Sequence, residues 1–187
     1  MLASVLALTL TAGALAAPCA HVNVLGMDLI KEYEGFVAAP SADPIGYQTV
    51  GYGHACAAPA CTDVPFAFPL SKRAASTLLK NNMPAVTTCL SDALRPARPH
   101  LVLNDNQWAG LASWAFNEGC AAVASSDLVA RLNAGEDPDV VAAAELPRWT
   151  SGRETTAELP VLRRRRAAEL ALFRSASNRQ AFPQCSS

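Results

Sequence analysis

The sequence predicts an α+β fold, in which a small lobe carrying a β-hairpin joins a larger helical lobe across a cleft. Apolar residues recur at helical spacing just before Gly35. Residues 41–54 combine proline and glycine with isoleucine, tyrosine, threonine and valine, which excludes a helix and favours short strands with tight turns. Helical patterns then dominate from Ser71 to Phe173. The 187 residues suit a single domain of two lobes.

The first helix is expected over residues 23–34, because Leu25, Leu29 and Tyr33 recur on one face. Gly35 can adopt the left-handed conformation that ends such a helix. The proline-containing segment 56–69 is expected to be a loop.

The later helices are expected from their caps and apolar stripes. Ser71 is a candidate N-cap for a helix that runs towards Leu94, with Pro84 as a kink or break. Asn104 or Asp105 caps the next helix, which Gly119 closes. Three further helices are expected: from Ser126 or Asp127 to Gly135, over 137–146, and from Pro160 to about Phe173.

The N-terminal segment has the composition of an export signal. Residues 1–17 carry no charged side chain, and their apolar run is too short to span a bilayer. Ala14-Leu15-Ala16 has the small-x-small pattern of a cleavage site, although a buried helix is the alternative. We therefore expect a signal peptide over 1–16 and a secreted, extracellular domain over 17–187. In that domain, 17–70 would hold the first helix and the β lobe, and 71–187 the helical lobe.

The cysteines have a structural meaning in an exported protein. Three disulfides are the default there, although the sequence alone does not choose among the possible connectivities. The pairs that we expect are Cys56 with Cys61, Cys89 with Cys120, and Cys19 with Cys185. A zinc site is disfavoured, because no C-x-x-C pair occurs and the histidines lack ligand spacing.

The charge excludes two classes of function. A formal net charge of −1, from 15 basic and 16 acidic residues, argues against nucleic-acid binding and against membrane disruption. No stretch after the N-terminal segment is long and apolar enough for insertion into a membrane. Nearly all arginines lie from Arg95 onward, so we expect local basic contacts on the helical side of the cleft.

Glu34, Asp43 and Thr49 form the one set that indicates chemistry. A helix C-terminus disfavours the charged form of a carboxyl, which helps Glu34 to hold a proton near neutral pH. Each residue alone also suits an ordinary role, as a solvated helix end, the start of a turn or a strand threonine. Together, two carboxyls and a hydroxyl near a cleft are what glycoside hydrolysis needs.

The spacing of Glu34-Gly35, Asp43, Thr49 and Gly51-Tyr52-Gly53-His54 resembles the phage-type lysozymes of glycoside hydrolase family 24. The resemblance covers residues 25–173, and the signal peptide and cysteines resemble secreted fungal-type members. Further matches are 104–107, 115–119, 126–135, Trp149 and the arginine run before Glu169. The chain departs from the family at Ser41, where many members carry tyrosine, and at 158–162.

The resemblance implies a lysozyme-like fold and an inverting hydrolase. Glu34 would be the general acid, Asp43 would activate or position the attacking water, and Thr49 would help to hold it. Inversion implies carboxyl groups about 6.5–9.5 Å apart. The substrate would be bacterial peptidoglycan, which the enzyme would cut between N-acetylmuramic acid and N-acetylglucosamine. We expect the enzyme to be a monomer that serves in defence or in feeding. No metal or organic cofactor is implied.

Two other functions compete with this one: hydrolysis of a chitin- or chitosan-like polymer, and non-catalytic wall binding by an antimicrobial protein. Retention of the Glu34, Asp43 and Thr49 set argues against a non-catalytic binder.

Several further side chains are candidates for substrate binding. Amides both donate and accept hydrogen bonds, which makes Asn104, Gln107 and Asn117 candidates for sugar contacts, although Asn104 suits a helix cap equally well. Arg163 of the run 163–166 could contact anionic peptide stems or muramyl lactate, or the run could be a solvated, salt-bridged helix face. We expect His54 to be a hydrogen-bonded structural histidine. The tryptophans are expected in the core, and Glu118 at a solvated helix end.

Overall fold

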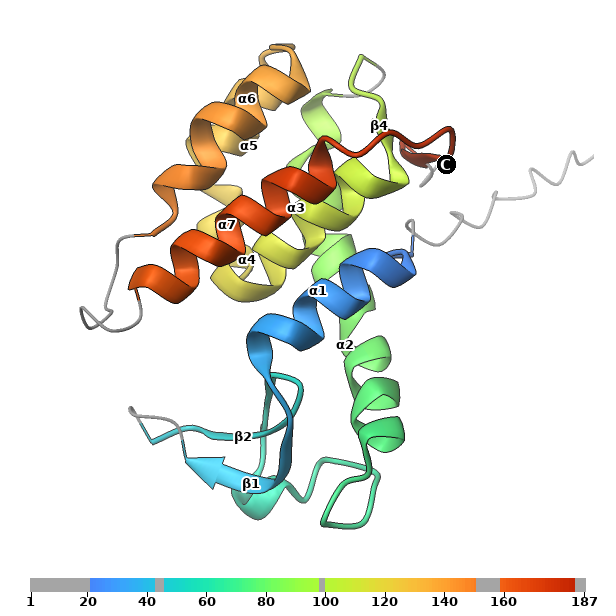
Figure 1. Ribbon diagram of the computed structural model, residues 1–187, viewed down its shortest axis with the longest axis vertical. Coiled ribbons are helices and arrows are strands. Elements are labelled where there is room, and N and C mark those ends of the chain that lie inside the picture. The colour runs from blue at the N-terminus through green and yellow to red at the C-terminus, as the bar shows by residue number, and fades with distance from the viewer. Residues whose placement is uncertain (1–20, 43–45, 98–99, 151–158, 184–187) are drawn as a thin grey trace, which may run out of the picture.

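One long helix, α2 (Lys72–Ala93), extends from a small lobe into a larger helical lobe (Figure 1). The computed structural model describes residues 21–42, 46–97, 100–150 and 159–183. The first half of α2 packs on the small core, through Ala75 and Leu78. Its second half, with Met83 and Leu90, packs on the main core. The predicted α+β class with two lobes is therefore confirmed.

The small lobe is an antiparallel sheet in the order β1-β2-β3 (Figure 1). Its strands are β1 (Val37–Ala42), β2 (Gln48–Gly51) and β3 (His54–Ala55), followed by a 3-10 turn, η1 (Pro59–Cys61). Ser41 pairs with Thr49 across the hairpin. The sheet packs on α2 through a small core: Val50, Cys61, Val64, Leu70, Ala75 and Leu78.

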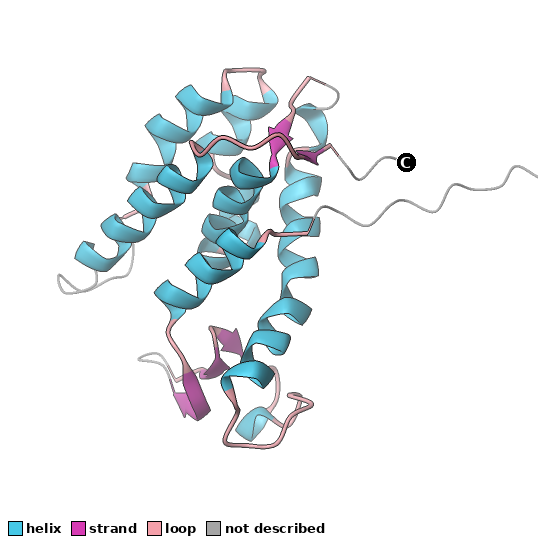
Figure 2. Cartoon of the chain, turned by 45° about the vertical axis from the view of Figure 1, so that its right-hand side comes forward, coloured by secondary structure: helices cyan, strands magenta, loops and turns pink. Residues whose placement is uncertain are grey.

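The larger lobe is built around α3, against which α1 and α7 lie (Figure 2). Its helices are α1 (Val24–Glu34), α3 (Asp105–Glu118), α4 (Cys120–Ala124), α5 (Asp127–Asn133), α6 (Pro138–Glu145) and α7 (Leu159–Phe173), with 3-10 turns η2 (Arg95–Ala97) and η3 (Leu146–Arg148). A two-stranded ribbon of β4 (Leu103–Asn104) and β5 (Gln180–Phe182) completes it. No helix within the described ranges is both long and apolar enough to cross a membrane.

Two glycines bring the three central helices close together. A Cβ on Gly26 of α1 would lie 2.7 Å from the Cβ of Ala109 in α3. A Cβ on Gly110 of α3 would lie 2.8 Å from the backbone oxygen of Glu169 in α7. Only glycine leaves room for backbones at these separations. The close packing puts the end of α1 beside the middle of α7.

The helix ends follow the predicted caps. The side chain of Asn23 accepts a hydrogen bond from the Gly26 amide, and Ser71 accepts one from Ala74. Gly35 ends α1 with a positive φ of 70°. Helix α2 continues through Pro84, so the alternative of a break there is wrong.

The periodicity of apolar residues in the sequence did not predict the shortest helix and strands. Helix α4 spans one turn, and β4 and β5 are too short to show alternation. The ribbon forms because the segment after α7 returns to the start of α3, which no local pattern encodes.

Both disulfides within the described residues match the expected pairs, Cys56–Cys61 and Cys89–Cys120. The third expected pair, Cys19 with Cys185, lies outside the described residues. Trp108 and Trp114 are fully buried, and Trp149 packs against the core, as expected.

Candidate active site

Glu34 is the last residue of α1, and its side chain is 19% exposed. Gly35 then turns the chain into β1, so the carboxyl lies where the two lobes meet. Gly53, in the turn between β2 and β3, faces it from the small lobe. A Cβ on Gly53 would lie 2.7 Å from Glu34 Oε2, and the φ of Gly53 is +73°. A residue without a side chain therefore gives the Glu34 carboxyl its space.

Arg165 of α7 holds the other side of this carboxyl. Its Nη1 donates a hydrogen bond to Glu34 Oε1 at 2.7 Å, and the arginine side chain is 4% exposed. The guanidinium also lies over the Tyr33 ring, 5.9 Å from its centroid. Burial, first among the causes, raises the pKa of Tyr33. Arg165 of α7 therefore contacts the last two residues of α1, Tyr33 and Glu34.

Glu169 lies one turn further along α7 and is completely buried. Its Oε1 accepts from Arg165 Nε at 3.2 Å and from the Ser113 hydroxyl at 2.8 Å. Its Oε2 accepts from Arg166 Nη1. A buried carboxylate is costly unless it is paired and hydrogen-bonded, and both oxygens meet that condition.

Arg166 connects Glu169 with the end of α3. Its Nη2 donates to Asn117 Oδ1 and to Glu118 Oε1, and its Nε donates to the Trp149 carbonyl at 2.9 Å. Asn117, a predicted sugar ligand, is therefore in the same network as Glu34. The expectation of a solvated Glu118 is wrong, because this carboxylate is ion-paired with a buried arginine.

The run 163–166 divides between two faces of α7. Arg165 and Arg166 are buried in the network, whereas Arg163 and Arg164 are exposed. Sequence reasoning singled out Arg163 and missed the two arginines that contact site residues. The helical repeat limits how many members of a run share a face, but it does not say which ones. Substrate binding by Arg163 stays a prediction.

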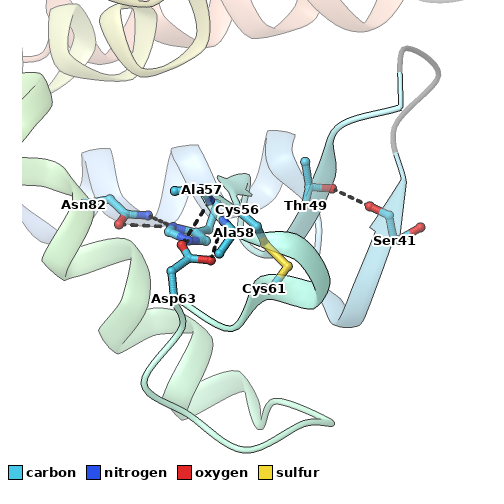
Figure 3. The surroundings of a disulfide bond; sticks show 9 residues. Ser41, Thr49, Cys56, Ala57, Ala58, Cys61, Asp63 and Asn82 are labelled. Atoms are coloured by element: carbon cyan, nitrogen blue, oxygen red, sulfur yellow. Dashed lines mark hydrogen bonds and ion pairs between the residues drawn. A yellow bond between two sulfur atoms is a disulfide. The ribbon is translucent and has the colours of Figure 1, made fainter.

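Thr49 lies on β2 and belongs to the small lobe. Its hydroxyl donates to the Ser41 carbonyl at 3.4 Å across the hairpin (Figure 3). Asp43, between β1 and β2 in the sequence, lies outside the described residues. The expected distance between the carboxyl groups of Glu34 and Asp43 therefore stays a prediction. The structure therefore places Glu34 at the end of α1 and Thr49 on β2, with β1 between them in the chain.

His54 is hydrogen-bonded through both ring nitrogens, which suits the structural role expected of it. Nδ1 is 3.0 Å from Asn82 Nδ2, and Nε2 is 3.4 Å from Asp63 Oδ2. Asp63 also accepts from the amides of Ala57 and Ala58, beside the Cys56–Cys61 disulfide (Figure 3). The bond from the Ala57 amide is the main cause that lowers the pKa of Asp63 below its usual range.

Asn104 and Gln107 lie at the other end of α3. Asn104 accepts from the amides of Asn106 and Gln107, and Gln107 Oε1 accepts from the Asn104 amide, which is a complete capping box. Nine residues of helix separate Asn104 from Ser113, or about 14 Å at 1.5 Å per residue. The structure confirms the capping role of Asn104 and does not bring either amide to Glu34.

A cavity of about 800 Å³ lies elsewhere, between the start of α1 and the middle of α2, and contains none of these site residues. Within the part of the chain that the structure describes, no group of three or more His, Cys, Asp or Glu side chains could hold a metal ion.

Comparison with known proteins identifies relatives over most of the chain. The family model described as phage lysozyme matches residues 31–169. The endolysin of Acyrthosiphon pisum secondary endosymbiont phage 1 is 31% identical over 160 residues, which are 83% of this chain and 99% of that endolysin. The endolysin of Bacillus phage PZA is 34% identical over 158 residues, which are 83% of this chain and 55% of that endolysin.

Solved structures show the same fold. The muramidase domain of SpmX from Asticaccaulis excentricus superimposes with a TM-score of 0.67 and 29% identity, over 83% of this chain and 99% of that domain. A P22 lysozyme variant gives a TM-score of 0.63 and 28% identity, over 80% of this chain and 98% of its own.

Proposed function

Because the chain belongs to the phage lysozyme family, we propose that it hydrolyses the β-1,4 bond between N-acetylmuramic acid and N-acetylglucosamine, with Glu34 as the acid. The chain is a glycoside hydrolase that acts on bacterial peptidoglycan and causes cell-wall lysis. Its muramidase neighbour shares the two-lobed fold that holds Glu34 at the lobe junction.

The single observation that carries this role is the position of the Glu34 carboxyl. Arg165 holds Oε1, and Oε2 faces Gly53 of the other lobe. A carboxyl with one oxygen held and the other directed to the junction is oriented to protonate a leaving oxygen there. Protonation of the glycosidic oxygen lets the C–O bond break as charge develops on the sugar ring.

Asp43 and Thr49 complete the reaction by their place in the motif. Asp43 follows Glu34 by nine residues and would take a proton from the attacking water, while the Thr49 hydroxyl helps to hold that water. Attack from the face opposite the leaving group inverts the anomeric carbon. The sequence spacing supports these two roles.

Replacement of the acid tests the assignment. Glu34→Gln keeps the size and the hydrogen-bond acceptor but has no proton to give, so we expect release of reducing ends from purified peptidoglycan to fall by about 10²–10⁴-fold. Mass spectrometry of the products should place the new reducing end on N-acetylmuramic acid. Glu32→Gln, an exposed change on the same helix, is the control and should retain activity. Equal activity of Glu34→Gln and the wild type would sink the proposal.

Export is part of the proposal. Residues 1–16 would direct secretion and be removed, because they carry an uncharged apolar run and a small-x-small site. The two disulfides support an oxidising compartment, since cytosolic thiols are usually kept reduced.

A further inference from the structure

Five charged side chains, beginning with Glu34, form a continuous series of ion pairs. We call Glu34, Arg165, Glu169, Arg166 and Glu118 the ion-pair chain, in that order of contact. Carboxylates and guanidiniums alternate along it. Its three middle members are almost completely buried, and its two ends are partly exposed.

The charges of the ion-pair chain balance only when one carboxyl is neutral. With every group ionised, three carboxylates face two guanidiniums, and arginine does not lose its proton in proteins. If Glu34 carries a proton, the two remaining carboxylates match the two guanidiniums. Unbalanced charge is expensive at buried positions, so the arrangement accommodates a protonated Glu34.

Glu169 is the residue that makes this balance possible. It accepts hydrogen bonds from both arginines and from the Ser113 hydroxyl. Arg165 shares its single positive charge between Glu34 and Glu169. Without Glu169, Glu34 would be the one carboxylate that contacts Arg165 among the described residues.

We propose that Glu169 is a positioning residue for the hydrolysis, acting as the permanent counter-ion of Arg165. Arg165 then orients the Glu34 carboxyl through Oε1 while its charge is shared with Glu169. Oε2, which faces Gly53 at the lobe junction, is left to carry the proton that is transferred. The inference deepens the proposed function and rests on Glu34 being the acid.

Other charged and titratable groups lie on α1 itself and on the elements that pack against it. Tyr33 and Glu32 lie on its own helix, and Arg164 of α7 interacts electrostatically with Tyr33. Glu118 of α3 reaches the carboxyl through the two arginines, and Tyr52 of the small lobe stands next to Gly53. Glu169→Gln keeps every one of these side chains and removes only the charge of Glu169, so a shift of the pH–rate profile reports the loss of that charge.

The test is the pH–rate profile of peptidoglycan hydrolysis by Glu169→Gln. The alkaline limb of the profile marks loss of the proton from the acid. In Glu169→Gln the positive charge of Arg165 is no longer shared with residue 169, which favours the ionised form of Glu34. We therefore expect the alkaline limb to move down by about one pH unit. At a pH on the limb, kcat should fall about tenfold, while KM and the acidic side of the profile stay unchanged. Glu169→Asp keeps the charge and should restore the wild-type limb.

Glu145→Gln is the matched control. Glu145 is also a buried carboxylate between two arginines, at 2.8 Å from Arg131 and 3.0 Å from Arg148, but it joins α5 to α6 and η3. Its loss should lower stability and leave the alkaline limb in place. A uniform loss of activity at every pH in Glu169→Gln, or the same limb shift in Glu145→Gln, would overturn the proposal and leave a structural role.

Thermal melts of each variant show whether it folds. If Glu169→Gln does not fold, Glu118→Gln at the partly exposed end removes a negative charge from the same ion-pair chain, and its limb should move down by a smaller amount. An unmoved limb would contradict the proposal. Wild-type activity in Glu34→Gln would instead defeat the proposed function, so the two failures are distinguishable.

Discussion

Gly53 shows how one residue can shape the surroundings of Glu34, the proposed acid, without a functional group of its own. Its positive φ of +73° suits glycine, and its missing side chain is what leaves space for Glu34 Oε2. The motif Gly51-Tyr52-Gly53-His54 thus has a steric reason at its third position. A methyl group there would have to displace the carboxyl or the hairpin.

Gly53→Ala should therefore lower kcat by tenfold or more, because a shift of about 1 Å in a catalytic group can cost about 10²-fold. The strained φ should also lower the free energy of unfolding by about 1–2 kcal/mol. Gly135→Ala is the control: its φ is +82° and nothing lies within 4 Å of the added Cβ. It should lose similar stability in urea unfolding and keep full activity. Wild-type kcat in Gly53→Ala would contradict the steric argument.

At the scale of the element, α3 is stabilised at its start and functional at its end. The capping box of Asn104 and Gln107 satisfies amides of the first turn. Ser113, about two and a half turns later, and Asn117 and Glu118 in the last turn contact side chains of α7. The same helix therefore holds one predicted residue, Asn117, that is linked to Glu34 through the ion-pair chain, and two, Asn104 and Gln107, that cap its start.

Asn104 variants separate capping from sugar binding. Asn104→Ala should lower the free energy of unfolding by about 1 kcal/mol, because the first-turn amides lose their acceptor. Asn104→Asp keeps the acceptor and removes the amide donor, so stability should be retained. An unchanged KM for peptidoglycan in Asn104→Asp would assign the residue to capping alone, whereas a raised KM would support the predicted sugar contact.

For the whole molecule, covalent links complement the two cores. Cys56–Cys61 closes a short loop of the small lobe, with five residues of separation. Cys89–Cys120 joins α2 to α4 across 31 residues and belongs to the large lobe. The long helix α2 contacts both cores, so the lobes are coupled through it.

The two disulfides should differ in their contribution to stability. A cross-link that closes a longer loop restricts the unfolded chain more, which predicts a loss of roughly 3–4 kcal/mol for Cys89→Ala with Cys120→Ala, and roughly 2 kcal/mol for the Cys56 and Cys61 pair. Urea unfolding of protein recovered from an oxidising compartment measures both. A larger loss from the small-lobe pair would show that native contacts, and not chain entropy, set the order.

Local signals accounted for most of the elements. Asn23, Ser71 and Asn104 begin helices because their short polar side chains can accept from first-turn amides, and Gly35 ends one because it tolerates a positive φ. These effects act within a few residues. Sequence patterns therefore predict these helix ends. The same patterns do not predict the ribbon of β4 and β5, because its two strands lie far apart in the chain.

The sequence by itself determined the fold class, the helix ends and the motif that contains Glu34, because each depends on local spacing or composition. Only the tertiary structure decided which arginines of 163–166 face inward. Every face of a helix is represented in that run, so the close packing of α7 on α3 at Gly110 makes the choice. The partners of Glu34 depend on that choice, because Arg165 is 131 residues away in the chain and meets Glu34 only when the helices pack.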